Sequence, residues 1–138
     1  MKTLLLKMLI TFVIVINAFT ACKTDPKTQI TGTWHVVDTK FESASHLEPE
    51  LQSFYATEMK SWIYTFNADS TMNVKQSDKD VPNRWKLNKK GDSLIIGNGA
   101  FFDVASKIDK LTDNELVIRT TQGIDSARVT QILYLRKK

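Results

Sequence analysis

Alternation of apolar and polar residues recurs along the chain from Ile30 onward and predicts short β-strands. In the segment Ser61–Asn67, Trp62, Tyr64 and Phe66 share one face, and mostly polar residues occupy the other. A period of two residues indicates a strand with one buried face. The segments with this pattern, or rich in β-branched and aromatic residues, are Ile30–Thr39, Ser61–Asn67, Thr71–Ser77, Asn83–Asn88, Ser93–Gly97, Ala100–Asp109, Glu115–Thr121 and Ser126–Arg136.

Short turn sequences separate these eight segments. Asn98-Gly99 is the strongest hairpin signal, and the segment Asp78–Pro82 is expected to be a loop. In the segment Ala100–Asp109 we expect Phe102 to face inward with Val104 and Ile108, because the opposite phase would bury charged side chains. Eight strands with short antiparallel connections predict an all-β fold, either an up-and-down barrel or a sandwich.

One segment, Ser45–Met59, follows a helical period instead. Leu47, Leu51 and Tyr55 lie at helical spacing before Met59. Ser45 and Glu48 fit a capping box, but Pro49 favours a start at Glu48 with proline as the first helical residue. We therefore expect one short α-helix between strands 1 and 2, where it can close one end of a barrel.

The first 21 residues have the features of an export signal. Lys2 and Lys7 precede a short apolar run, and small residues follow it. The run is shorter than the roughly 20 apolar residues that a permanent membrane span needs. Phe19-Thr20-Ala21-Cys22 resembles the lipobox of bacterial lipoproteins, which implies cleavage before Cys22 and lipidation of its thiol. The alternatives are an ordinary secretory signal with a leftover thiol, or an uncleaved anchor.

Cleavage changes the composition of the chain. Removal of residues 1–21 leaves 117 of the 138 residues, enough for one domain, and lowers the formal net charge from +4 to +2. No basic block with interleaved aromatics suggests nucleic acid. Residues 22–29 are polar and contain a proline, which predicts a flexible tether before a domain at residues 30–138. Asp25 in this tether resembles the surface-export signal of Bacteroidetes lipoproteins.

The domain resembles the small lipocalin-like domains of Bacteroidetes lipoproteins. The matching pieces are Gly32-Thr33-Trp34, Tyr64-Thr65-Phe66-Asn67-Ala68-Asp69-Ser70, Trp85, Gly91-Asp92-Ser93-Leu94, Ile108-Asp109-Lys110-Leu111-Thr112 and Tyr134-Leu135-Arg136. The family turn usually has glycine where Ser70 stands. The resemblance implies an eight-stranded antiparallel barrel in which Gly32 and Trp34 are structural and Arg136 packs on the indole at the closed end.

The predicted barrel interior is the candidate functional region. An eight-stranded barrel can be filled by side chains or hold one small ligand. The residues expected to line a ligand site are aromatic or amide-bearing: Trp62, Tyr64, Phe66, Gln76, Trp85, Phe102, Gln131 and Tyr134. One hypothesis is therefore a carrier of a small apolar ligand. The other is a protein-interaction or structural lipoprotein with a filled core, for example an inhibitor of an envelope enzyme such as lysozyme.

Catalytic and metal-binding patterns are weak. Cys22 is assigned to lipid, and His35 and His46 lie on different elements with no second ligand at metal-binding spacing. We expect no enzymatic activity, no cofactor, no metal site and a monomer. The expected partners are a membrane, reached through the lipid on Cys22, and a small apolar ligand. The expected location is the cell envelope, at the periplasmic or surface face of the outer membrane.

Overall fold

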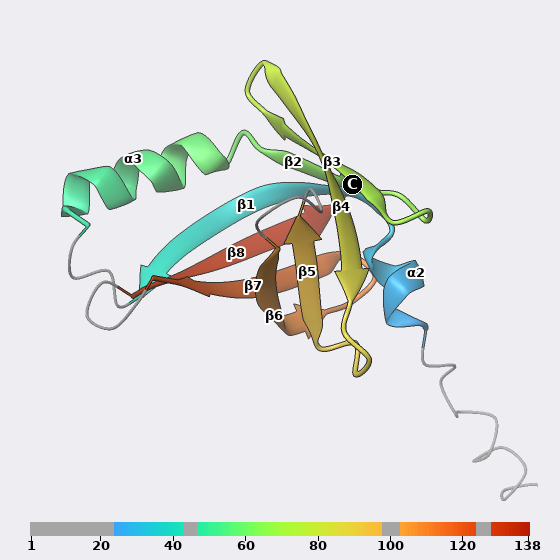
Figure 1. The fold of residues 1–138 in the computed structure, drawn as a ribbon. Coiled ribbons are helices and arrows are strands. Elements are labelled where there is room, and N and C mark those ends of the chain that lie inside the picture. Colours follow the sequence, from blue (N-terminus) through green and yellow to red (C-terminus); the bar gives the residue numbers. More distant parts are fainter. Residues whose placement is uncertain (1–23, 43–46, 98–102, 124–127) are drawn as a thin grey trace, which may run out of the picture.

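The structure is a computed structural model that describes residues 24–42, 47–97, 103–123 and 128–138. Eight antiparallel strands close into a barrel in which each strand pairs with its sequence neighbour and β8 pairs with β1 (Figure 1). The strands are β1 (Gly32–Glu42), β2 (Ile63–Phe66), β3 (Thr71–Gln76), β4 (Lys79–Leu87), β5 (Ser93–Gly97), β6 (Val104–Leu111), β7 (Glu115–Gln122) and β8 (Val129–Lys137). The predicted all-β, up-and-down barrel is confirmed.

In the part of the chain that the structure describes, two helices accompany the barrel. α2 (Pro26–Ile30) precedes β1, and α3 (Pro49–Met59) lies between β1 and β2, where one helix was predicted. α3 extends beside the far half of β1 and away from the barrel (Figure 1). None of the helices in the described ranges is long and apolar enough to cross a membrane.

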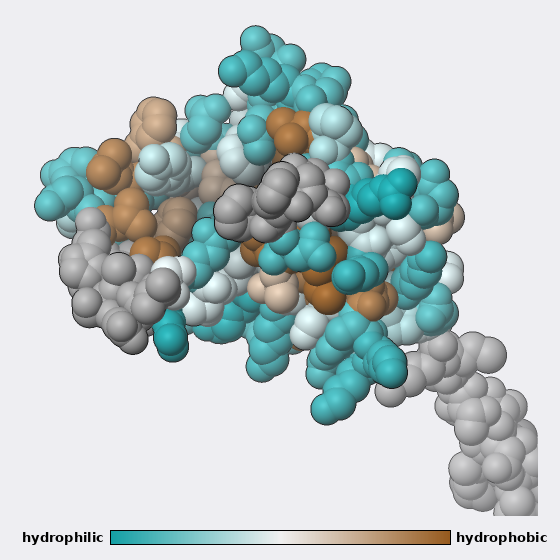
Figure 2. All heavy atoms as spheres, viewed as in Figure 1, coloured by the Kyte–Doolittle hydropathy of each residue, from teal (hydrophilic) through white to brown (hydrophobic). Residues whose placement is uncertain are grey.

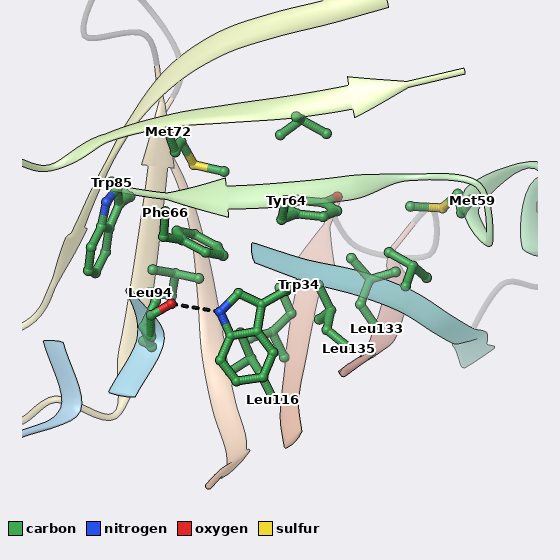
Figure 3. Packing of buried hydrophobic residues seen from close by; sticks show 14 residues of the cluster. Trp34, Met59, Tyr64, Phe66, Met72, Trp85, Leu94, Leu116, Leu133 and Leu135 are labelled. Atoms are coloured by element: carbon green, nitrogen blue, oxygen red, sulfur yellow. Dashed lines mark hydrogen bonds between the residues drawn. The ribbon is translucent and has the colours of Figure 1, made fainter. Parts of the chain in front are cut away.

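The core follows from the two-residue period of the strands. Each strand turns one face to the interior, and the buried set of the barrel comes from that face (Figure 3). Phe66 and Leu116 are among its fully buried side chains. In β6, Val104 and Ile108 face inward while Asp103, just before the strand, lies outside and pairs with Lys86, which confirms the predicted phase.

Strand β4 is longer than its sequence pattern indicates. The predicted loop Asp78–Pro82 is wrong, because β4 begins at Lys79 and pairs with β3 up to Thr71↔Arg84. Proline is tolerated here because β4 pairs with β5 only from Arg84 onward. Within the described residues, Pro82 therefore has no partner on β5, and its missing N–H group leaves no described β5 acceptor unpaired.

Helix α3 begins where its proline requires. Pro49 is the first helical residue and Glu48 is the N-cap, as the proline predicts, and the Glu48 side chain makes no capping hydrogen bond. Ser45 and His46 lie outside the described residues. The apolar stripe is mostly exposed: Met59 alone is buried among the described helix residues, and it packs inside the barrel mouth.

Helix α2 occupies residues that the sequence assigned to a flexible tether. Asp25 caps it by accepting a hydrogen bond from the Thr28 backbone N–H at 3.1 Å, and Pro26 packs beside Gly91. Its last residue, Ile30, is completely buried in the barrel core. The tether therefore ends before Asp25, because α2 is packed across one end of the barrel.

We call the end of the barrel that α2 covers the closed end. The turns at residues 67–70, 88–92 and 112–114 lie at the same end. Trp34 closes it from inside: its indole Nε1 donates to the Ile30 carbonyl at 2.6 Å (Figure 3). The cation over the indole is Lys137, with Nζ 5.1 Å from the ring centroid and 2.8 Å from the Gln29 carbonyl. The predicted packing of Arg136 on Trp34 is wrong. Arg136 is exposed, because neighbouring residues of a strand face opposite sides.

Gly32 permits this arrangement. Its φ is +130°, a backbone conformation that side chains with a Cβ rarely adopt. A Cβ on Gly32 would also lie 2.6 Å from the Lys137 Cε, which passes over it on the way to the indole. The glycine two residues before Trp34 is thus required by the closed end and not by a ligand.

Candidate ligand-binding cavity

Aromatic side chains fill the half of the barrel nearest to the closed end. The Phe66 ring packs edge-on against Trp85 with centroids 5.4 Å apart, and Tyr64 stacks above Phe66 at 6.3 Å. The Trp85 indole Nε1 donates to the Asn67 carbonyl at 2.9 Å, which fixes the ring across the barrel end. Figure 3 shows these rings in one row, with Tyr64 the furthest from α2. This half of the interior is packed.

The other half contains a cavity of about 250 Å³. It opens at the opposite end of the barrel, which we call the open end, where β3, β5 and β7 finish. Its aliphatic walls are Val74, Ile96, Val104, Ile118 and Leu133, with Gly97 beside them. Its polar side chains are Tyr64, Gln76, Asn83, Ser106, Thr120, Gln122 and Gln131. The cavity is therefore lined by neutral polar groups as much as by hydrocarbon.

Several of these polar groups are held in place by the fold. The hydroxyls of Ser106 and Thr120, on the paired strands β6 and β7, lie 2.6 Å apart and are buried. The Gln131 Nε2 lies 2.9 Å from the Met59 sulfur, which links the cavity wall to α3. Burial raises the pKa of Tyr64 from 10.0 to about 12, because removal from water disfavours the phenolate. Tyr64 therefore presents a neutral hydroxyl at physiological pH.

The cavity brings together three of the eight predicted ligand-site residues. Tyr64, Gln76 and Gln131 all line it. Phe66 and Trp85 face inward as predicted, but they belong to the packed half, where both are almost fully buried.

The remaining three predicted residues contribute nothing to the described lining. Trp62 is half-buried against the core, and its Nε1 has no hydrogen-bond partner among the described residues. Phe102 lies outside the described residues, as do Asn98 and Gly99 of the predicted hairpin.

The prediction that Tyr134 faces inward is wrong. It lies beside Asp38 on the outer face of the barrel, with the Lys40 ammonium 5.3 Å from its ring. Leu133 and Leu135 take the inward positions. The four consecutive residues 132–135 are all apolar or aromatic, so alternation alone assigns no face in this strand.

Sequence reasoning missed most of the polar lining. Thr120 and Gln122 continue the phase of Leu116 and Ile118 toward the open end, and Ser106 has the phase of Val104 and Ile108. The signal that could have found these three residues is the two-residue period of each strand, followed to the end of the strand.

The chain has no match among models of known protein families, and no curated protein sequence matches it. Within the described residues, no group of three or more His, Cys, Asp or Glu side chains is placed to hold a metal ion.

Proposed function

We propose that the protein is a lipid-anchored lipoprotein of the cell envelope whose barrel binds a small molecule at its open end. The observation that carries the binding proposal is the cavity of about 250 Å³, where Tyr64, Gln76 and Gln131 converge on the same space. Concave sites that combine apolar walls with a few placed polar groups are the usual ligand sites of proteins. In this proposal the protein is a binding module and not an enzyme.

The proposed relationship to lipocalin-like lipoproteins has support from the fold. The glycine and tryptophan of Gly32-Thr33-Trp34 both serve the closed end, as the resemblance implies, and the barrel is an eight-stranded meander. Lys137 takes the position that the resemblance gave to Arg136. The cavity lining differs from the apolar interior expected from the sequence, so the ligand we propose is not purely apolar.

The proposed anchor is Cys22, in the outer membrane. Its support is the sequence of residues 1–22 and the absence of any other cysteine in the chain. One lipid chain gives only reversible binding, whereas two or more chains hold a protein stably, at about 0.8 kcal/mol for each buried CH₂ group. A thioether-linked diacylglyceryl group on Cys22 meets this requirement.

Native mass spectrometry of the protein purified from the membranes of producing cells tests both halves of the proposal. We expect a chain that starts at Cys22, carries a diacylglyceryl mass, and holds a non-covalent adduct that leaves on collisional activation. Cys22→Ser should lose the lipid mass and remain unprocessed, while Thr24→Ser, a matched change two residues away, should keep both. A chain of unmodified mass refutes the anchor, and a lipidated chain with no adduct counts against the carrier.

A second candidate function is protein interaction. The described outer face of α3 exposes large apolar side chains, including Phe54, 61% exposed, and Leu51, 46% exposed. Apolar residues gather on this helix in Figure 2. Exposed apolar patches on a small domain often mark binding surfaces for other proteins. This candidate requires no occupant in the cavity, so an adduct in the spectrum distinguishes it from the first.

A further inference from the structure

The described cavity lining is electrically neutral. No Asp, Glu, Lys or Arg side chain lines the cavity within the described ranges, whereas seven neutral polar side chains do. A charged ligand entering this space loses its hydration without gaining a counter-charge, which is strongly unfavourable. The lining therefore favours a neutral ligand.

The same lining does not suit a purely hydrocarbon ligand. Amides and hydroxyls each both donate and accept hydrogen bonds, and the Ser106–Thr120 bond uses only part of the capacity of those two hydroxyls. An acyl chain would take these groups out of water and leave them unpaired, which reduces affinity. A ligand with several hydroxyl or amide groups pairs with them, while its C–H faces contact Val74, Ile118 and Leu133.

The size of the cavity limits the ligand further. Its volume of about 250 Å³ lies just below the range of about 300–1,000 Å³ typical of sites for drug-sized ligands. A monosaccharide or a small polyol is of the right size, whereas a long acyl chain is not.

The orientation of the barrel agrees with a water-soluble ligand. If Cys22 carries the lipid, only two residues separate it from Asp25, which caps α2 at the closed end. From Cys22 to Asp25 the fully extended backbone reaches at most about 10 Å. The closed end is thus held at the bilayer, and the cavity opens at the other end of the barrel, toward the aqueous compartment.

We propose that the cavity binds a neutral, water-soluble molecule of monosaccharide or polyol size through hydrogen bonds to its amide and hydroxyl lining. This inference rests on the proposed function, since it names the class of ligand for the same cavity. It assigns the protein to capture from the aqueous phase and not to transport of lipid from the membrane.

NMR titration of the chain from residue 22, with Cys22→Ser, tests this directly, because every strand of the barrel lies within it. The neutral probes are D-glucose, N-acetylglucosamine and glycerol; D-gluconate is the anionic counterpart and 1-octanol the apolar one. We expect at least one neutral probe to shift the side-chain amide signals of Gln76 and Gln131 saturably, and at least tenfold more tightly than D-gluconate or 1-octanol.

Variants locate the binding. Gln76→Leu and Gln131→Leu should each weaken binding of that probe at least tenfold. Gln29→Leu, the same change at the closed end, should leave it unchanged. Because Gln131 also contacts Met59, the two lining variants are compared after their melting temperatures confirm folding.

The outcomes separate this inference from the proposed function. If 1-octanol or D-gluconate binds the cavity more tightly than all three neutral probes, the ligand class is overturned, but the proposal that the barrel is a binding module stands. If Gln29→Leu weakens binding of the neutral probe as much as the two lining variants do, the probe does not bind in this cavity and the inference is overturned. If none of the five probes shifts a cavity signal, the ligand class proposed here is overturned. The binding function itself is overturned only if the native mass spectrum of the lipidated chain also shows no adduct.

Discussion

The closed end offers the sharpest test of the forces that hold the barrel, through Trp34→Phe. Trp34 and Ile30 are both 0% exposed, and the indole N–H donates to the Ile30 carbonyl at 2.6 Å. Phenylalanine removes the donor and leaves a buried carbonyl unpaired, at a cost of about 1–3 kcal/mol. The smaller ring adds a void comparable to that of a buried Ile→Val change, about 0.5–1.5 kcal/mol. We therefore expect the free energy of unfolding to fall by about 1.5–4.5 kcal/mol.

The assay is urea unfolding of the chain from residue 22, followed by the fluorescence of the remaining tryptophans. Trp62→Phe is the matched control, because the Trp62 Nε1 has no partner among the described residues and its removal breaks no hydrogen bond there. We expect that variant to lose less than about 1 kcal/mol. If Trp34→Phe costs no more than Trp62→Phe, the hydrogen bond to Ile30 does not hold α2 in place.

Two further changes test the open end and a turn. The pKa of Tyr64 is about 12 in the folded chain and 10.0 when unfolded, so the unfolded state loses its proton first and stability falls as pH rises above 10. Between pH 9 and 11 the unfolding free energy of the native chain should fall by about 1.4 kcal/mol more than that of Tyr64→Phe. Parallel plots of unfolding free energy against pH for the two proteins would contradict this. Ser70 has a φ of 70°, in the left-handed region. Ser70→Gly should stabilise the chain by about 0.5–1 kcal/mol in thermal unfolding, and a lower melting temperature would show that its 3.4 Å contact with Lys27 matters more.

Much of the architecture could be predicted from local pattern. The two-residue period of β2, β3 and β7 decides which side chains face inward, because a strand with one polar face has one way to bury the other. The start of α3 at Pro49 was equally predictable, since the fixed φ of proline suits the first helical turn and no later one. These features depend on residues close together in the sequence.

The candidate cavity was predictable only in part. Tyr64, Gln76 and Gln131 stand in phase with strong apolar neighbours, so their inward direction follows from the sequence. Tyr134 does not, because β8 is apolar on both faces and its register with β1 decides the outcome. This space stays unfilled and has a polar lining because of how the side chains of seven strands, β2 to β8, meet. The pattern of a single strand does not contain that information.

The sequence by itself determined eight short antiparallel strands with one helix after the first strand, because alternation and turn residues act locally; that pattern left a barrel and a sandwich open. Only the tertiary structure decided what closes and what opens that barrel. Residues 26–30 are mostly polar and form a helix of only five residues. Its end is held because Trp34 donates to the Ile30 carbonyl and because Lys137, 108 positions from Gln29, donates to the Gln29 carbonyl. Lys137 replaces Arg136 over Trp34 because the register of β1 with β8 shifts the choice by one residue. Such contacts join distant parts of the chain, and only the folded barrel brings them together.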